Sequence, residues 1–129
     1  MPELSQKSLN KLSQCHPDLQ RVFLEVIKTF DFTVIEGYRT KEDQDANFYK
    51  GVSRVKWPNS KHNTLPSKAI DVWPWPVPRD SKGNLDSNSP KWRELAALVL
   101  EKAEELGVKI EWGGNWTSIV DLPHFQIKD

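Results

Sequence analysis

The chain has 129 residues, of which 37% are hydrophobic and 28% are charged. This length suits one domain with its own hydrophobic core, and the composition is not that of a disordered protein. The 18 Lys and Arg residues equal the 18 Asp and Glu residues, so no net charge favours nucleic acid or an anionic membrane as a partner.

Cysteine content and the N-terminal residues bear on where the protein folds. Cys15 has no second cysteine to pair with, which excludes an intramolecular disulfide. Residues 1–12 lack the apolar core of a signal peptide, and no apolar run approaches the roughly 18 residues of a membrane span. We expect a protein that folds in a cytoplasm, does not insert into membranes, does not bind nucleic acid and is a monomer.

The first half of the chain predicts three helices and one strand. Residues 5–15 have a weak helical pattern, and Pro17 opens a stronger helix whose apolar residues recur on one face up to residue 30. Residues 32–38 are rich in β-branched and aromatic side chains, as in a strand. Thr40 can cap a further helix, with Asp43 three residues on.

The second half predicts loops, short strands and one long helix. Residues 52–68 have no regular period, and the Pro-, Gly- and Ser-rich segment before Pro90 cannot be regular structure. The clearest helix begins at Pro90 and ends at Gly107. Three short strands are predicted, at residues 69–73, 108–112 and 124–127.

This order of elements predicts the fold class. Helices come first, and short strands joined by long loops follow them. The arrangement favours a single α+β domain over residues 1–129, with N-terminal helices packed on a small, mostly antiparallel sheet.

Two of the three histidines stand in suggestive positions. His16 lies at a helix entrance, where capping explains it, but His62 lies in a loop and Asp71 follows on the next strand. Because side chains alternate along a strand, Asp71 points away from Ile70 and Val72. A carboxylate is costly to bury unless it is paired or binds a metal. Taken alone, an edge-strand aspartate in a loop hydrogen bond explains this position equally well.

The third histidine lies near the C-terminus. His124 follows Asp121 by three residues, and the intervening proline favours extended chain over a helix. Together, His62, Asp71 and His124 make the ligand set of a catalytic zinc site with one position open for water. Asp121 is then the candidate acid/base, and Arg39 is a candidate donor to the developing oxyanion.

Several motifs occur in the order of a known family. S-K-H, A-I-D, E-W-G-G-N-W and D-L-P-H-F, with E-G-Y-R-T upstream, make residues 30–127 resemble the zinc D-alanyl-D-alanine carboxypeptidase and L-alanyl-D-glutamate endopeptidase family, closest to its small phage endolysins. The resemblance implies a zinc site in a cleft beside the sheet, with the ligands, acid/base and arginine named above. It also implies a substrate site lined by Ser60, Trp112 and Trp116.

Two departures from the family pattern bear on substrate choice. The segment from His62 to Asp71 is two residues longer than the common H-x-x-G-x-A-x-D spacing. The acid/base position holds Asp121 where some members use glutamate, which is one methylene longer.

Three functions remain open from the sequence. The first is a phage endolysin that cuts the L-alanyl-D-glutamate bond of peptidoglycan stem peptides, held in the host cytoplasm until a separate membrane-permeabilising protein releases it. The second is a D-alanyl-D-alanine carboxypeptidase with the same site. The third is a non-catalytic zinc-containing module that binds the cell wall or belongs to a phage virion, and the presence of Asp121 argues against it.

Overall fold

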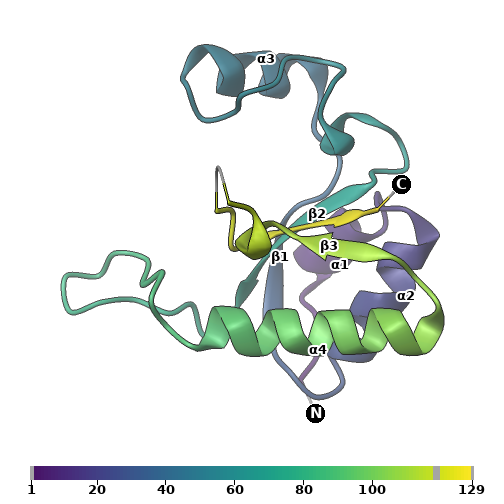
Figure 1. Cartoon of the computed structure of the whole chain (residues 1–129), viewed down its shortest axis with the longest axis vertical. Coiled ribbons are helices and arrows are strands. Elements are labelled where there is room, and N and C mark those ends of the chain that lie inside the picture. Colours follow the sequence, from purple (N-terminus) through teal and green to yellow (C-terminus); the bar gives the residue numbers. More distant parts are fainter. Residues whose placement is uncertain (1, 118–119, 129) are drawn as a thin grey trace.

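The computed structural model of the chain describes residues 2–117 and 120–128. The helices and strands follow one another in an α+β order, as the sequence predicts (Figure 1). They are α1 (Gln6–Leu12), α2 (Pro17–Val26), β1 (Phe32–Glu36), α3 (Lys41–Tyr49), β2 (Ala69–Pro74), α4 (Lys91–Leu106), β3 (Ile110–Trp112) and β4 (His124–Ile127), with single 3₁₀ turns at η1 (Lys61–Asn63) and η2 (Gly113–Asn115).

The four strands form one sheet in the order β1-β2-β4-β3. Every neighbouring pair is antiparallel, which confirms the expectation of a mostly antiparallel sheet. The last strand of the chain therefore lies inside the sheet, directly beside β2. This pairing places Asp71 of β2 opposite His124 of β4, although the two residues are far apart in the sequence.

One face of the sheet carries the hydrophobic core. Ile70, Val72 and Phe125 are buried there together with apolar residues of α1, α2 and α4. Phe23 of α2 meets Phe32 and Phe125 edge to face, with ring centroids 5.6 Å apart in both pairs. Alternation along β2 and β4 turns the intervening Asp71 and His124 to the other face, as the sequence predicts for Asp71.

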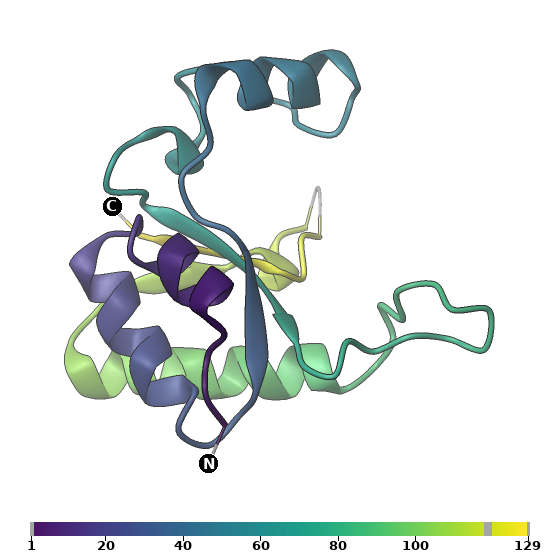
Figure 2. The same ribbon diagram turned by 180° about the vertical axis from the view of Figure 1, so that it is seen from behind.

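The remaining helix, α3, stands apart from the other three. Figures 1 and 2 show it across the sheet from α4. Residues 37–40 connect it to β1, and the longer segment 50–68 connects it to β2. Thr40 caps its start, since its side chain accepts a hydrogen bond from Asp43 N. His16 caps α2 in the same way through Nδ1, which accepts from Asp18 N. Both contacts confirm the capping roles expected from the sequence.

α1 stops at Leu12 instead of residue 15, and β3 begins at Ile110 instead of residue 108. Two further elements end earlier than their patterns predict. α2 stops at Val26 instead of continuing to residue 30, because residues 27–30 turn the chain into β1. β1 stops at Glu36 instead of residue 38, because the backbone of Gly37 leaves the sheet to contact α1 and η1. The early end of β1 matters for function, as described below.

The segment between β2 and α4 is irregular, as predicted, and projects from the body of the molecule (Figure 1). Asp80 Oδ1 closes one of its turns by accepting from the backbone N–H groups of Lys82 and Asn84. Over residues 2–117 and 120–128, none of the helices has both the length and the apolar character that a membrane crossing requires.

Candidate metal centre and active-site cleft

Three side chains from separate elements converge on one point. His62 comes from η1, Asp71 from β2 and His124 from β4. His62 Nε2 lies 3.4 Å from Asp71 Oδ2, and His124 Nδ1 lies 3.1 Å from Asp71 Oδ1. One ligand atom from each residue can be chosen so that all three lie within 4.8 Å of one another. The spacing is that of a site able to hold a single metal ion.

His62 is held in place by a backbone carbonyl. Its Nδ1 lies 2.7 Å from the carbonyl oxygen of Gly37, which can only accept, so Nδ1 carries the hydrogen. The position next to α1 requires glycine, because a Cβ there would lie 2.6 Å from the carbonyl oxygen of Lys11. The early end of β1 thus delivers the acceptor that orients His62.

The other ring nitrogen of His62 shows that a cation fits the site. Nε2 is buried and has no hydrogen-bond partner within the part of the chain that the structure describes. With its hydrogen on Nδ1, this nitrogen presents a lone pair towards the carboxylate of Asp71. Two electron pairs facing each other in a buried site are unfavourable, and an unsatisfied buried acceptor is rare. A divalent cation between them satisfies both, and two imidazoles with one carboxylate suit zinc.

Asp71 and His124 shift each other's pKa in the protein without metal. Burial alone would raise the pKa of Asp71, but its hydrogen bond with His124 and the nearby imidazoles of His124 and His62 hold that pKa well below its usual range. Burial alone would lower the pKa of His124, but its hydrogen bond to Asp71 and the Asp71 charge raise that pKa above 6.5. Asp71 therefore stays ionised and available as a ligand.

Asp121 lies at the same site, carried by the turn before β4. Its backbone N–H donates to the carbonyl of Gly113 over 3.0 Å, and a Cβ on Gly113 would clash with the Asp121 backbone. Burial raises the pKa of Asp121, and the negative charge of Asp71 raises it further against the opposing histidines and Arg39. A carboxyl group with a raised pKa beside a metal site is suited to accept and return a proton.

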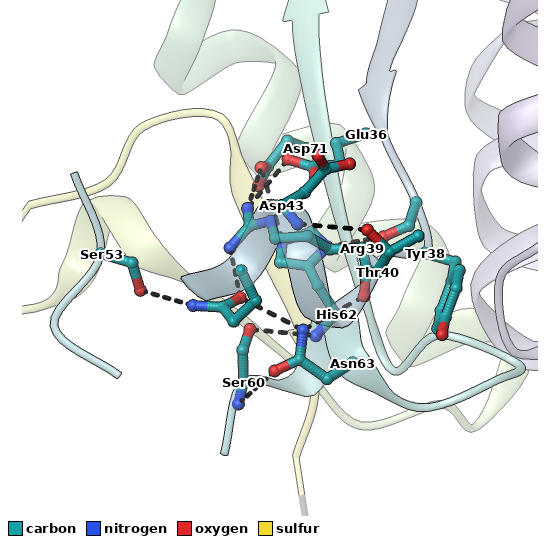
Figure 3. A network of polar contacts seen from close by, with 12 residues as sticks. Glu36, Tyr38, Arg39, Thr40, Asp43, Ser53, Ser60, His62, Asn63 and Asp71 are labelled. Atoms are coloured by element: carbon teal, nitrogen blue, oxygen red, sulfur yellow. Dashed lines mark hydrogen bonds and ion pairs between the residues drawn. The ribbon is translucent and has the colours of Figure 1, made fainter. Parts of the chain in front are cut away.

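Arg39 lies on the opposite side of Asp71 from His124. Its Nε and Nη2 each donate to a carboxylate oxygen of Glu36 over 2.8 Å, and Nη2 is 3.9 Å from Asp71 Oδ2 (Figure 3). A shift of register after Val34 puts Glu36 directly opposite Asp71 in the β1–β2 pair. The guanidinium therefore stands between two carboxylates that would otherwise repel each other.

Gln44 of α3 holds Arg39 from the other side, and sequence reasoning missed it. Its side chain is fully buried, its Oε1 accepts from Arg39 Nη1 over 2.8 Å, and Asn63 Nδ2 donates to the same oxygen. Its Nε2 donates to Ser53 Oγ and to the carbonyl of Val55. These four contacts join α3, the loop that follows α3, and η1 around the arginine. Figure 3 shows Arg39, Ser53 and Asn63 grouped at this point. No periodic pattern in α3 marks this position.

The converging residues line a cleft of about 820 Å³ beside the sheet. Ser60 and Trp116 line it together with Arg39, the metal-site residues and Asp121. Trp116 tilts against His124 with ring centroids 5.1 Å apart. Trp112 instead is buried, stacks on Phe125 and donates from Nε1 to the carbonyl of Leu122. Of the two tryptophans, one walls the cleft and the other packs beneath it.

Comparison with known proteins places the chain in a family. The profile of the phage L-alanyl-D-glutamate peptidase family matches residues 2–127. The chain belongs to this family. It is 31% identical to the L-alanyl-D-glutamate peptidase of Escherichia phage T5, over 98% of this chain and 89% of that protein. It is also 30% identical to the L-alanyl-D-glutamate peptidase of Listeria phage A118 over 92% of this chain, which spans 39% of that longer relative.

A solved structure agrees with the family assignment. The crystal structure of the Serratia marcescens L-Ala D-Glu endopeptidase ChiX matches with a TM-score of 0.79 and 30% sequence identity. The match covers 98% of this chain and 90% of that chain. The two chains therefore share the same fold over nearly their whole length.

The longer segment between His62 and Asp71 is held away from the cleft. Ser67 within it is fully buried, its N–H donates to the carbonyl of Gln14, and its carbonyl accepts from His16 N, both over 2.8 Å. The cleft lining includes residues 60–62 but none of residues 63–68, all of which the structure describes. Through Ser67, this segment is bound to the residues between α1 and α2, and residues 63–68 do not line the cleft.

Proposed function

We propose that this protein is a zinc-dependent L-alanyl-D-glutamate peptidase that hydrolyses the stem peptides of peptidoglycan. Family membership and the names of its relatives in phages and Serratia support the reaction. The observation that carries the metal dependence is the buried, unpartnered Nε2 of His62, which faces Asp71 in the same cleft as His124.

The proposed zinc ligands are His62 through Nε2, Asp71 through a carboxylate oxygen and His124 through Nδ1. When bound, zinc supplies a Lewis acid that activates water for attack and polarises the scissile carbonyl. The protein contributes by holding the three ligands from η1, β2 and β4 at fixed positions. Its second contribution is the hydrogen-bond acceptor on Gly37 that keeps Nε2 of His62 free of hydrogen.

Asp121 is the proposed acid/base. It takes the proton of the attacking water and returns it to the amino group that leaves. Its raised pKa helps it hold that proton between the two steps. Arg39 is proposed to stabilise negative charge on the carbonyl oxygen, because its guanidinium is fixed by Glu36 and Gln44 before substrate arrives.

The substrate is proposed to lie along the cleft between Ser60 and Trp116. Both residues line it. The hydroxyl of Ser60 accepts from the N–H of His62, and Trp116 packs against the ring of His124. We assign Trp112 a different role from the one the resemblance implies. Its buried indole supports the turn that carries Trp116 and Asp121, so it acts on substrate only through that turn.

Digestion of purified peptidoglycan tests the reaction. We expect new amino-terminal D-glutamate on the released stem peptides, identified by end-group labelling and mass spectrometry. Release of free D-alanine without new D-glutamate termini would show a carboxypeptidase instead. Metal analysis of protein purified without chelator should give about one zinc per chain, and a much lower value would contradict the ligand assignment.

The biological setting is proposed from the phage relatives. We propose that residues 1–129 act as one monomeric peptidase domain, accumulate in the host cytoplasm and reach the cell wall when another protein permeabilises the membrane. Expression in bacteria should leave cells intact until the membrane is opened with chloroform, after which they should lyse. Light scattering should give the mass of one chain, and lysis without permeabilisation would contradict the release step.

A further inference from the structure

A chain of hydrogen bonds runs from His124 across the sheet, away from the other ligands. His124 Nε2 lies 2.8 Å from Gln126 Oε1, and Gln126 Nε2 donates to Glu111 Oε1. The strand register builds this chain, because Gln126 follows His124 on the same face of β4 and Glu111 stands opposite Gln126 on β3. On the other side of Gln126, β2 presents Ala69, which has no polar side-chain atom.

The chain has a fixed direction, because only its last member is restricted to one role. An ionised carboxylate can only accept hydrogen bonds, so Glu111 requires the amide nitrogen of Gln126 to face it. The amide oxygen of Gln126 must then face His124, and this oxygen also can only accept. Nε2 of His124 must therefore carry a hydrogen. In the neutral ring, the lone pair is left on Nδ1, the nitrogen that lies 3.1 Å from Asp71 Oδ1.

The need for such control comes from Asp71 itself. A carboxylate next to Nδ1 attracts a hydrogen to that nitrogen, and a neutral imidazole with its hydrogen on Nδ1 cannot bind a metal there. An acceptor at Nε2 keeps the other hydrogen in place while the one on Nδ1 is released. The two histidines of the site thus carry their hydrogen on opposite ring nitrogens and bind the metal through the other one. Gly37 reserves Nε2 of His62, and Gln126 reserves Nδ1 of His124.

We propose that Glu111 and Gln126 are positioning residues that keep a hydrogen on Nε2 of His124 and so reserve its Nδ1 for the metal. This inference rests on the proposed function, since it uses the metal centre formed by His62, Asp71 and His124. Gln126 also lines the cleft, whereas Glu111 is not among the lining residues, and neither is proposed as a ligand of the metal. They act on the metal site by fixing the orientation of the His124 ring and the ring nitrogen that carries its hydrogen.

Zinc affinity in single and exchanged variants tests the proposal. Metal-free proteins are titrated with zinc in competition with a chromogenic chelator, and no peptidase assay is needed. Gln126→Leu should weaken zinc binding about 10- to 100-fold, the usual effect of losing a partner that orients a metal-binding histidine. Glu111→Gln should weaken it less, because an amide at that position no longer fixes the direction of Gln126.

Exchange of the two residues provides the rescue. In the double variant Glu111→Gln with Gln126→Glu, the carboxylate accepts directly from His124 Nε2 and the amide supports it from β3. Affinity should return to within a few-fold of wild type. The single variant Gln126→Glu should bind zinc more weakly than the double variant, because the carboxylates of residues 111 and 126 then face each other. Glu105→Gln on α4 is the control, since it removes the same charge from an exposed pair with Lys102.

Ring-nitrogen NMR of zinc-loaded protein gives a second readout. The hydrogen on His124 Nε2 should exchange slowly with solvent in wild type and in the exchanged variant, and rapidly in Gln126→Leu. Equal zinc affinity and equal exchange in wild type and Gln126→Leu would overturn the proposal while leaving the metal centre intact. Failure of wild type to bind zinc would overturn the metal centre itself, together with this inference.

Discussion

The carbonyl oxygen of Gly37 lies 2.7 Å from Nδ1 of His62, so the end of strand β1 decides which nitrogen of this histidine can bind a metal. The same carbonyl also accepts from the hydroxyl of Ser67 over 3.2 Å, which holds it between the metal site and the longer loop. The residue is glycine because α1 passes too close for a side chain. The close packing of Gly37 against α1 thus determines which ring nitrogen of His62 is available to a metal.

Gly37→Ala should therefore impair metal binding. The added Cβ would lie 2.6 Å from the carbonyl of Lys11 and 3.1 Å from Cys15 Sγ, so the backbone must shift and its carbonyl leaves His62. We expect zinc affinity to fall about 10- to 100-fold, measured by chelator competition. Gly83→Ala is the control, because Gly83 has a positive φ in an exposed loop with open space around it. That variant should lose some stability but no zinc affinity.

Asp121→Asn should separate catalysis from metal binding. The substitution keeps the size of the side chain but removes its ability to take a proton, so we expect hydrolysis to fall about 10²- to 10⁴-fold. Zinc content should stay at the wild-type level, because Asp121 is not among the three clustered ligand residues. Turbidity loss of permeabilised cells and metal analysis give the two readouts. Unchanged lysis would contradict the role of Asp121 as the acid/base.

Local patterns predicted the parts of this site that depend on short stretches of chain. Alternation along a strand placed Asp71 on the face away from the core, and the structure puts His124 beside it by pairing β2 with β4. Gln126 could have been found by the same rule, since it lies two residues after His124 on one strand. Capping by Thr40 was also predictable, because a cap needs only the next few residues.

The features of the site that local patterns did not predict depend on contacts between distant segments of the chain. Gln44 binds Arg39, Asn63 and a loop after α3, and nothing within α3 distinguishes it from a solvent-exposed glutamine. The different positions of Trp112 and Trp116 are likewise set by packing against β4 and by the cleft, which a single sequence does not display. Sequence reasoning found residues with known chemistry and missed those that hold them.

Gln44→Leu should destabilise the protein and disturb the cleft wall. Leucine fills similar space but leaves Arg39 Nη1 without its acceptor and takes one of two donors from the carbonyl of Val55, which keeps the hydroxyl of Ser53. Leaving buried polar groups unsatisfied costs about 1–3 kcal/mol each, so we expect a loss of about 2–4 kcal/mol in urea unfolding. Gln6→Leu is the matched control, because the Gln6 amide donates to Asn10 on the exposed surface, and the variant should change stability by less than about 0.5 kcal/mol.

Cys15 should be unreactive in the folded protein. Burial, with a smaller contribution from the negative charge of Asp71, raises the pKa of its thiol to about 12, so the reactive thiolate is scarce at pH 8. We expect labelling by a disulfide reagent to follow the opening of the core and to become fast in denaturant. Rapid labelling of the folded protein at pH 8 would contradict this burial, and Cys15→Ala should show no labelling under either condition.

The stabilising effect of zinc should grow with pH. In the protein without metal, folding raises the pKa of His124 through its contact with Asp71. The protonated His124 therefore contributes fully to the free energy of unfolding below about pH 6.5, and this contribution is lost as pH rises through the pKa of the folded state. The ionised Asp71, whose pKa is lowered by folding, contributes to the free energy of unfolding above about pH 3.8, and this contribution is lost as pH falls through the pKa of the folded state.

Zinc binds more tightly as its ligands lose protons. At a free zinc concentration of 100 times its Kd, binding adds about 2.7 kcal/mol to the free energy of unfolding. The difference in Tm between loaded and chelator-treated protein should therefore widen from pH 6 to pH 8. In Asp71→Asn it should be small at both pH values, and a constant difference in wild type would contradict the coupling.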